Sequence, residues 1–250
     1  MRLAVVASGS RGNCYILKDS DNYLMLDCGE YVKWADVLAG CDFMIGNVDA
    51  LLVTHWHRDH LPNTRKIQRM GIPIYGCDEL EAFTKLTQGE SIHGIQAKHM
   101  TKIANRWKVV PWYVPHSGND NDNVPCFAYY IESPSSHKMV YITDFMYSPV
   151  TFKSWNVNTI LVACNHDDEL DEEENEAKIR HIVSGHSSLS TVNELIRVNQ
   201  TESLRNVILC HLSSDNATPS VMKETIQQTC GDNVTVNIAT KGKTIELKER

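Results

Sequence analysis

Short apolar runs separated by turn residues occur along the whole chain, and amphipathic stretches lie between them. Residues 3–7 and 13–18 alternate in polarity around the turn at Ser8–Gly12, which predicts two paired strands. Further strands are predicted at 23–27, 48–53, 72–75, 124–132, 138–143, 159–163, 206–210, 234–239 and 244–247, with a strand-rich stretch over 91–115. Predicted helices cover about 33–39, 61–70, 78–87, 170–184, 189–199 and 218–230. The pattern predicts an α/β (α+β) protein in which two sheets pack together with helices outside.

The length and the cysteine content indicate the number of domains and the state of the thiols. A chain of 250 residues is of a size that often forms one domain, so we expect a single domain over residues 1–250. No apolar stretch approaches the roughly 18 residues of a membrane span, and the apolar start is too short for a secretion signal. Eight cysteines are scattered without a CxxC pair, which favours reduced, buried thiols in a cytoplasmic protein. Cys210, beside His211, is left open as a thiolate ligand.

The net charge of −7 comes from one segment. Residues 167–176 hold eight of the 31 acidic residues, and the remainder nearly balance the 24 basic ones. The body of the protein therefore lacks the basic stripe that grips long nucleic acids. We expect the acidic segment to face away from any anionic substrate. The helix predicted at 170–184 would either cap the site or pair with a second subunit in a homodimer.

The segment Thr54-His-Trp-His-Arg-Asp-His60 carries the strongest chemical signal. Three histidines and an aspartate, His55, His57, Asp59 and His60, directly follow the apolar run 48–53. Neutral imidazole and carboxylate groups are ligands for zinc, manganese or iron. A solvated loop that happens to be rich in histidine is the alternative interpretation. The position after a buried strand favours a metal site.

Three further residues occupy the same kind of position. His116, Asp144 and His211 each follow a predicted strand and open a loop. Taken singly, a histidine there is usually a turn or core residue, and an aspartate is usually a turn former. Taken with the four residues above, they provide enough nitrogen and oxygen ligands for two metal ions.

Together these residues resemble those of the metallo-β-lactamase superfamily, and most closely its YycJ/WalJ-type hydrolases, which are related to tRNase Z and to phage cyclic-nucleotide phosphodiesterases. Five other segments add to the resemblance and spread it over the chain. They are Ala7-Ser-Gly-Ser-Arg-Gly-Asn-Cys14, Leu26-Asp-Cys-Gly29, Asn165-His-Asp167, and the pair Gly185-His-Ser-Ser188 and His211-Leu-Ser-Ser-Asp-Asn-Ala-Thr-Pro219.

The resemblance implies a four-layer αβ/βα sandwich with the site at one edge, and two divalent ions, of which Zn²⁺ is the first expectation and Mn²⁺ or Fe the alternatives. It implies that His55, His57 and His116 hold the first ion, that Asp59, His60 and His211 hold the second, and that Asp144 bridges them. Asp27 would orient a ligand by hydrogen bonding. His186 would protonate the leaving oxygen, and Asp59 and Asp144 would complete the catalytic set.

The chain departs from the family pattern at three points. Ala163 stands where related sequences carry glutamate, and Trp56 is bulkier than the usual residue between the first two histidines. The basic arm of true tRNase Z enzymes is not visible, which argues against transfer-RNA processing.

The resemblance therefore implies a metal-dependent phosphodiesterase that cleaves nucleic acid. The near-neutral body leaves a second hypothesis open, a 3′,5′-cyclic nucleotide phosphodiesterase that degrades a small signalling nucleotide. A non-catalytic binding module stabilised by metal is a third, against which the seven-ligand set argues. A β-lactamase or thioester hydrolase fits less well, since aspartate rather than cysteine stands at position 144.

Overall fold

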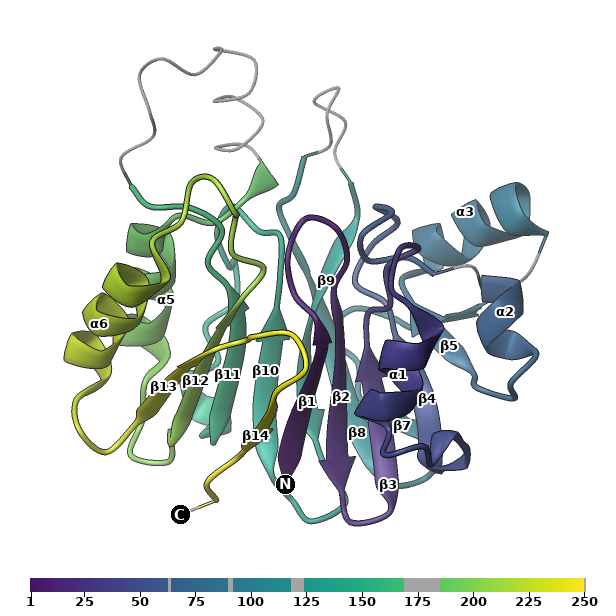
Figure 1. The fold of residues 1–250 in the computed structure, drawn as a ribbon, viewed down its shortest axis with the longest axis horizontal. Helices are drawn as coiled ribbons and strands as arrows, with labels where there is room; N and C mark the ends of the chain where they lie inside the picture. The colour runs from purple at the N-terminus through teal and green to yellow at the C-terminus, as the bar shows by residue number, and fades with distance from the viewer. Residues whose placement is uncertain (63, 90–91, 118–123, 169–184, 250) are drawn as a thin grey trace.

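The computed structural model describes residues 1–62, 64–89, 92–117, 124–168 and 185–249, and its backbone forms two facing sheets with helices outside (Figure 1). The first sheet has the order β14-β1-β2-β3-β4-β5-β6, and the second the order β13-β12-β11-β10-β9-β8-β7. The strands of the first sheet are β1 (Arg2–Ala7), β2 (Cys14–Asp19), β3 (Asn22–Leu26), β4 (Val48–Leu52), β5 (Ile74–Gly76), β6 (His93–Gly94) and β14 (Thr244–Glu246). Those of the second are β7 (Thr101–Ile103), β8 (Trp107–Val114), β9 (Cys126–Glu132), β10 (Lys138–Ile142), β11 (Thr159–Ala163), β12 (Asn206–Cys210) and β13 (Thr235–Ile238).

The helices form the outer layers. They are α1 (Trp34–Gly40), α2 (Thr64–Gln68), α3 (Asp78–Gln88), α5 (Leu189–Asn199) and α6 (Pro219–Cys230), with short 3-10 turns at Ile45–Asn47 and Lys153–Trp155. Buried side chains of α5 and α6, such as Ile196 and Ile226, pack with Val162 of β11 in a cluster on the outer side of the second sheet. A separate core joins the inner faces of the sheets, where Leu24 meets Tyr141 and Phe127 in one cluster. Two sheets that face each other, with helices on their outer sides, confirm the predicted sandwich. The helices are needed because both faces of each sheet have to be buried.

Most predicted elements are present, with differences at the helix ends. The helix expected at 61–70 is shorter, Thr64–Gln68. Pro62 restrains the chain before it, and Gly71 with φ of +77° turns the chain after it. The helix expected at 170–184 lies outside the described residues. Within the described ranges, no helix combines the length and apolar character needed to cross a membrane.

The carboxyl ends of several strands lie at the same edge of the sandwich. Strands β3 and β4 are parallel, and so are β10, β11 and β12. Strand β8 is antiparallel to β9, which is antiparallel to β10, so β8 runs in the same direction as β10. Each of the predicted ligands comes shortly after one of these strands. The topology therefore places residues that are distant in sequence on one edge, at the top of Figure 1.

All eight cysteines are free thiols with buried side chains, as the sequence predicted. Burial raises the pKa of Cys41 to about 11 and that of Cys77 to about 12. Cys210 lies in the core between the sheets and belongs to neither group of metal-ligating side chains found among the described residues. Cys41 and Cys77 are thus held in the protonated form, in which thiols are poor nucleophiles.

We predict that the folded protein reacts with less than one equivalent of a thiol reagent such as 5,5′-dithiobis(2-nitrobenzoate) at pH 7.5, because all eight thiols are buried and out of reach of the reagent. After unfolding in guanidinium chloride, all eight thiols should react, which absorbance at 412 nm measures by released thiolate. Fast reaction of several thiols in the folded protein, or fewer than eight after unfolding without reductant, would contradict the buried free-thiol assignment.

Candidate metal centre

Three of the predicted site residues follow strands in an unusual backbone conformation. Asp27 after β3, Asp144 after β10 and His211 after β12 have φ of +51°, +40° and +52°. Positive φ is unfavourable for residues with a Cβ and costs on the order of 1–3 kcal/mol each. All three side chains are buried. The packing around them thus holds three strained turns at the edge where the candidate ligands meet.

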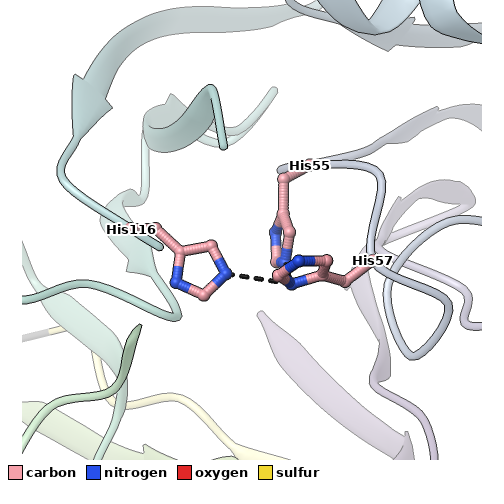
Figure 2. A group of neighbouring side chains, drawn as sticks. All are labelled: His55, His57 and His116. Atoms are coloured by element: carbon pink, nitrogen blue, oxygen red, sulfur yellow. Dashed lines mark hydrogen bonds between the residues drawn. The ribbon is translucent and has the colours of Figure 1, made fainter. Parts of the chain in front are cut away.

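The first group of ligand atoms comes from His55, His57 and His116 (Figure 2). The Nδ1 atom of His57 lies 3.0 Å from Nε2 of His55 and 3.0 Å from Nε2 of His116. A single proton on His57 can be donated to only one of these two nitrogens. A cation between the three rings would be bound by all three lone pairs, so this cluster fits a metal ion.

Hydrogen bonds on the far side of two rings determine which nitrogen carries the proton. His116 Nδ1 lies 2.7 Å from the carbonyl oxygen of Gly185, which can only accept, so Nδ1 donates. The Thr54 hydroxyl donates to the Asp27 carboxylate and accepts from His55 Nδ1 at 3.0 Å. Nε2 of both His55 and His116 is therefore unprotonated and faces the cluster, as a ligating imidazole requires.

The second group comprises Asp59, His60, Asp144 and His211, whose ligand atoms lie within 4.8 Å of one another. Asp144 Oδ2 lies 2.8 Å from His60 Nε2 and 3.6 Å from His211 Nε2. The same oxygen is 3.6 Å from His55 Nε2, which belongs to the first group. Asp144 is thus the side chain that connects the two groups.

The two groups differ in their electrostatics. Burial, together with the neighbouring histidines, holds the pKa of His55 well below its usual value, and burial lowers that of His116 to about 4. These rings are neutral near pH 7, which leaves their lone pairs available. In the second group, burial opposes charge on His60, but Asp59, Asp144 and Asp27 outweigh it and raise its pKa. The carboxylates there attract positive charge, which a metal ion would supply in place of the imidazole protons.

Asp27 supports the second group without reaching its centre. Its carboxylate accepts from His60 Nδ1 at 2.7 Å and from the backbone N–H of Thr54 at 2.8 Å. It also accepts from the hydroxyl of Tyr141 at 2.6 Å. Sequence reasoning anticipated a supporting position for Asp27, but it missed Thr54 and Tyr141. Tyr141 lies within a strand and is 114 residues away, so no local pattern pointed to it.

Asn13 and Gly29 are two other residues whose positions the sequence did not explain. Asn13 Nδ2 lies 3.1 Å from His60 Nε2, and the Asn13 backbone N–H donates to the carbonyl oxygen of Asp59 at 2.7 Å. A Cβ on Gly29 would lie 2.3 Å from the same carbonyl oxygen. Only glycine lets the chain after Asp27 pass this close to the loop that carries the histidines.

His186 lies at the edge of the second group. Its Nδ1 is 3.1 Å from Oδ1 of Asp144, and its side chain is 21% exposed. Asn165, from the segment Asn165-His-Asp167, donates through its side-chain amide to the His211 carbonyl oxygen at 2.9 Å. Ala163, where related sequences carry glutamate, accepts from the hydroxyl of Ser187 at 2.7 Å through its backbone oxygen. The structure therefore brings together all seven predicted ligands and His186.

Comparison with known proteins identifies the family of this chain. The model of a beta-lactamase superfamily domain matches residues 44–212. Exodeoxyribonuclease WalJ of Streptococcus pneumoniae (serotype 2, strain D39 / NCTC 7466) is 23% identical over 172 residues, which cover 68% of this chain and 64% of WalJ. The chain thus matches less than two thirds of the length of that relative.

Two solved structures share the fold. The metallo-β-lactamase fold protein YhfI from Bacillus subtilis has a TM-score of 0.72 at 20% identity, with 98% of each chain covered. The short form of human tRNase Z has a TM-score of 0.59 at 15% identity, with 99% of this chain and 100% of that one covered. With the matching family model, these likenesses show that the chain belongs to the beta-lactamase superfamily and has its metallo-hydrolase fold.

Proposed function

We propose that this protein is a phosphodiesterase that cleaves nucleic acid with two bound divalent metal ions. The observation that carries the proposal is the pair of ligand groups joined by Asp144, whose Oδ2 lies within 3.6 Å of nitrogens in both. The name of the relative WalJ, an exodeoxyribonuclease, supports a phosphodiester of DNA as the substrate class.

Each ligand has a proposed place. His55, His57 and His116 hold the first ion, Asp59, His60 and His211 hold the second, and Asp144 is shared. Imidazole with carboxylate suits zinc first, and manganese or iron as alternatives. When bound, such ions lower the pKa of water and neutralise charge on phosphate oxygens.

The protein's own groups prepare the site for this chemistry. Asp27 and Gly185 accept the Nδ1 protons of His60 and His116, so Nε2 of each ring faces the centre, where a metal ion would replace any Nε2 proton of His60. Burial of Asp144 keeps water from screening its charge, and His211 and His60 more than offset that burial and hold its pKa low. Asp144 therefore stays ionised, as a shared ligand must.

His186 is the proposed proton donor to the leaving oxygen. Its hydrogen-bond distance to Asp144 fixes the orientation of the ring, while its partial exposure leaves it accessible to a substrate. A positioned imidazole of this kind typically contributes about 10²–10⁴ in rate when the leaving group needs a proton.

A cyclic nucleotide is the second candidate substrate. The observation in its favour is the charge of the chain, in which 24 basic residues are opposed by 31 acidic ones. Screening the metal-loaded protein against cyclic nucleotides and labelled DNA or RNA, with chromatographic readout, would distinguish the two. Binding to a polymer should also weaken steeply with salt, whereas binding to a small nucleotide should not.

We predict that Asp144→Ala and His57→Ala each abolish metal-dependent hydrolysis of bis(p-nitrophenyl) phosphate, because each removes a ligand from the centre. Release of p-nitrophenolate measures the rate, and circular dichroism checks the fold. His99→Ala is the matched control, since His99 is exposed and lies outside both groups. Full activity of both ligand variants would refute the assignment.

Asp27→Asn should weaken zinc binding by about 10–100-fold, because it removes the charge that orients His60. Tyr141→Phe removes one hydrogen bond to the same carboxylate and should have a smaller effect. Competition with a chromophoric chelator measures both affinities. Wild-type affinity in Asp27→Asn would show that this carboxylate does not support the centre.

His186→Ala should lower kcat for a DNA oligonucleotide by about 10²–10⁴. The loss should be much smaller for bis(p-nitrophenyl) phosphate, because p-nitrophenolate leaves without a proton. Zinc affinity, measured in parallel, should stay within a few fold of the wild type. An equal loss on both substrates would point to a structural role for His186 instead.

A further inference from the structure

A pocket of about 420 Å³ lies beside the candidate metal centre, and none of the candidate ligands lines it. One wall is the turn Ser8–Gly12 between β1 and β2. The opposite wall is formed by the segment that precedes and begins α1, with Tyr31, Val32, Lys33 and Asp36. Ala7, Leu212, Ser214 and Lys241 complete the lining.

The turn that forms this wall is hydrogen-bonded to residues of the candidate metal centre. The Ser8 hydroxyl accepts from the backbone N–H of His211 at 3.0 Å. Asn13, at the other end of the turn, donates to the Asp59 carbonyl oxygen and lies 3.1 Å from His60 Nε2. One side of the turn thus contacts the centre, and residues of the same turn line the pocket.

Two glycines keep the turn tight. Gly9 and Gly12 have φ of +140° and +151°, a region that residues with a Cβ rarely adopt. A Cβ on Gly12 would also lie 3.0 Å from Cγ2 of Val32 on the opposite wall. The small residues therefore let the two walls approach each other, and Ser8, Ser10 and Ser214 are among the residues that line the pocket.

The pocket concentrates positive charge in an acidic chain. Three cations line it, Arg11, Lys33 and Lys241, against one carboxylate, Asp36. Lys241 pairs with Asp36 at 2.7 Å. In the described part of the chain, Arg11 and Lys33 have no ion pair, and both are exposed. The guanidinium of Arg11 and the ammonium of Lys33 offer the donors that phosphate oxygens accept.

We propose that this pocket binds a phosphate group of the substrate next to the one that is cleaved. The inference rests on the proposed phosphodiesterase function and deepens it, because the preferred substrate must then carry at least two phosphates. An oligonucleotide meets this requirement, whereas a cyclic mononucleotide has only one phosphate. Arg11 and Lys33 are specificity residues in this scheme and take no part in the cleavage itself.

The test compares thymidine dinucleotide TpT, with one phosphate, and trinucleotide TpTpT, with two. The metal-loaded wild type should have a kcat/KM at least about tenfold higher for TpTpT, since its second phosphate can make charged hydrogen bonds that TpT cannot. The double variant Arg11→Ala/Lys33→Ala should lose this preference through KM. Its rates on TpT and on bis(p-nitrophenyl) phosphate should stay unchanged. Lys223→Ala, an exposed lysine on α6, is the matched control.

Binding supplies a second readout that does not depend on turnover. Fluorescence anisotropy of labelled TpTpT with the metal-free protein should show affinity that the double variant loses and Lys223→Ala keeps. Equal affinity in wild type and double variant, or equal losses on TpT and TpTpT, would overturn the pocket assignment. If binding depends on Arg11 and Lys33 but no phosphodiester is hydrolysed, the pocket stands and the proposed function fails.

Discussion

The structure depends on a buried negative charge that has to be balanced. Asp144 lies between two sets of imidazoles, almost fully buried, in a strained turn at the end of β10. Without a positive partner, a carboxylate in this position would cost several kcal/mol in desolvation. The histidines supply that partner when protonated, and a bound cation could do so with full charge. The edge of the sandwich therefore favours a bound cation, which agrees with the metallo-hydrolase fold of the chain.

Hydrogen-bond partners of the candidate ligands fix the orientation of the imidazole rings. His60 donates its Nδ1 proton to Asp27, and His116 donates its Nδ1 proton to the Gly185 carbonyl, so Nε2 of each ring faces the centre. Gly29 allows the chain after Asp27 to pass against Asp59. These contacts come from both sheets. The centre is consequently coupled to the packing of the whole sandwich, and loss of that packing would scatter the ligands.

The metal centre and the cationic pocket share one structural part, the turn Ser8–Gly12. Its backbone and side-chain bonds reach His211 and Asp59 on one side, and its residues line the pocket on the other. A substrate phosphate in the proposed pocket would thus be held by the same turn that contacts the candidate metal ligands His211 and Asp59. The pocket would therefore favour substrates with two phosphates over those with one, because a second phosphate can contribute binding energy only if it reaches that pocket.

Sequence alone determined the two-sheet sandwich with outer helices, since strand and helix periodicity are local properties of the chain. It also pointed to the seven candidate ligands, because His55 to His60 lie in one short loop and the other three each follow a strand. The hydrogen bond from Tyr141 to Asp27, the approach of Gly29 to Asp59 and the cationic pocket were decided only by the tertiary structure. Each depends on distances between segments far apart in the chain, and no local pattern of residues encodes such a distance.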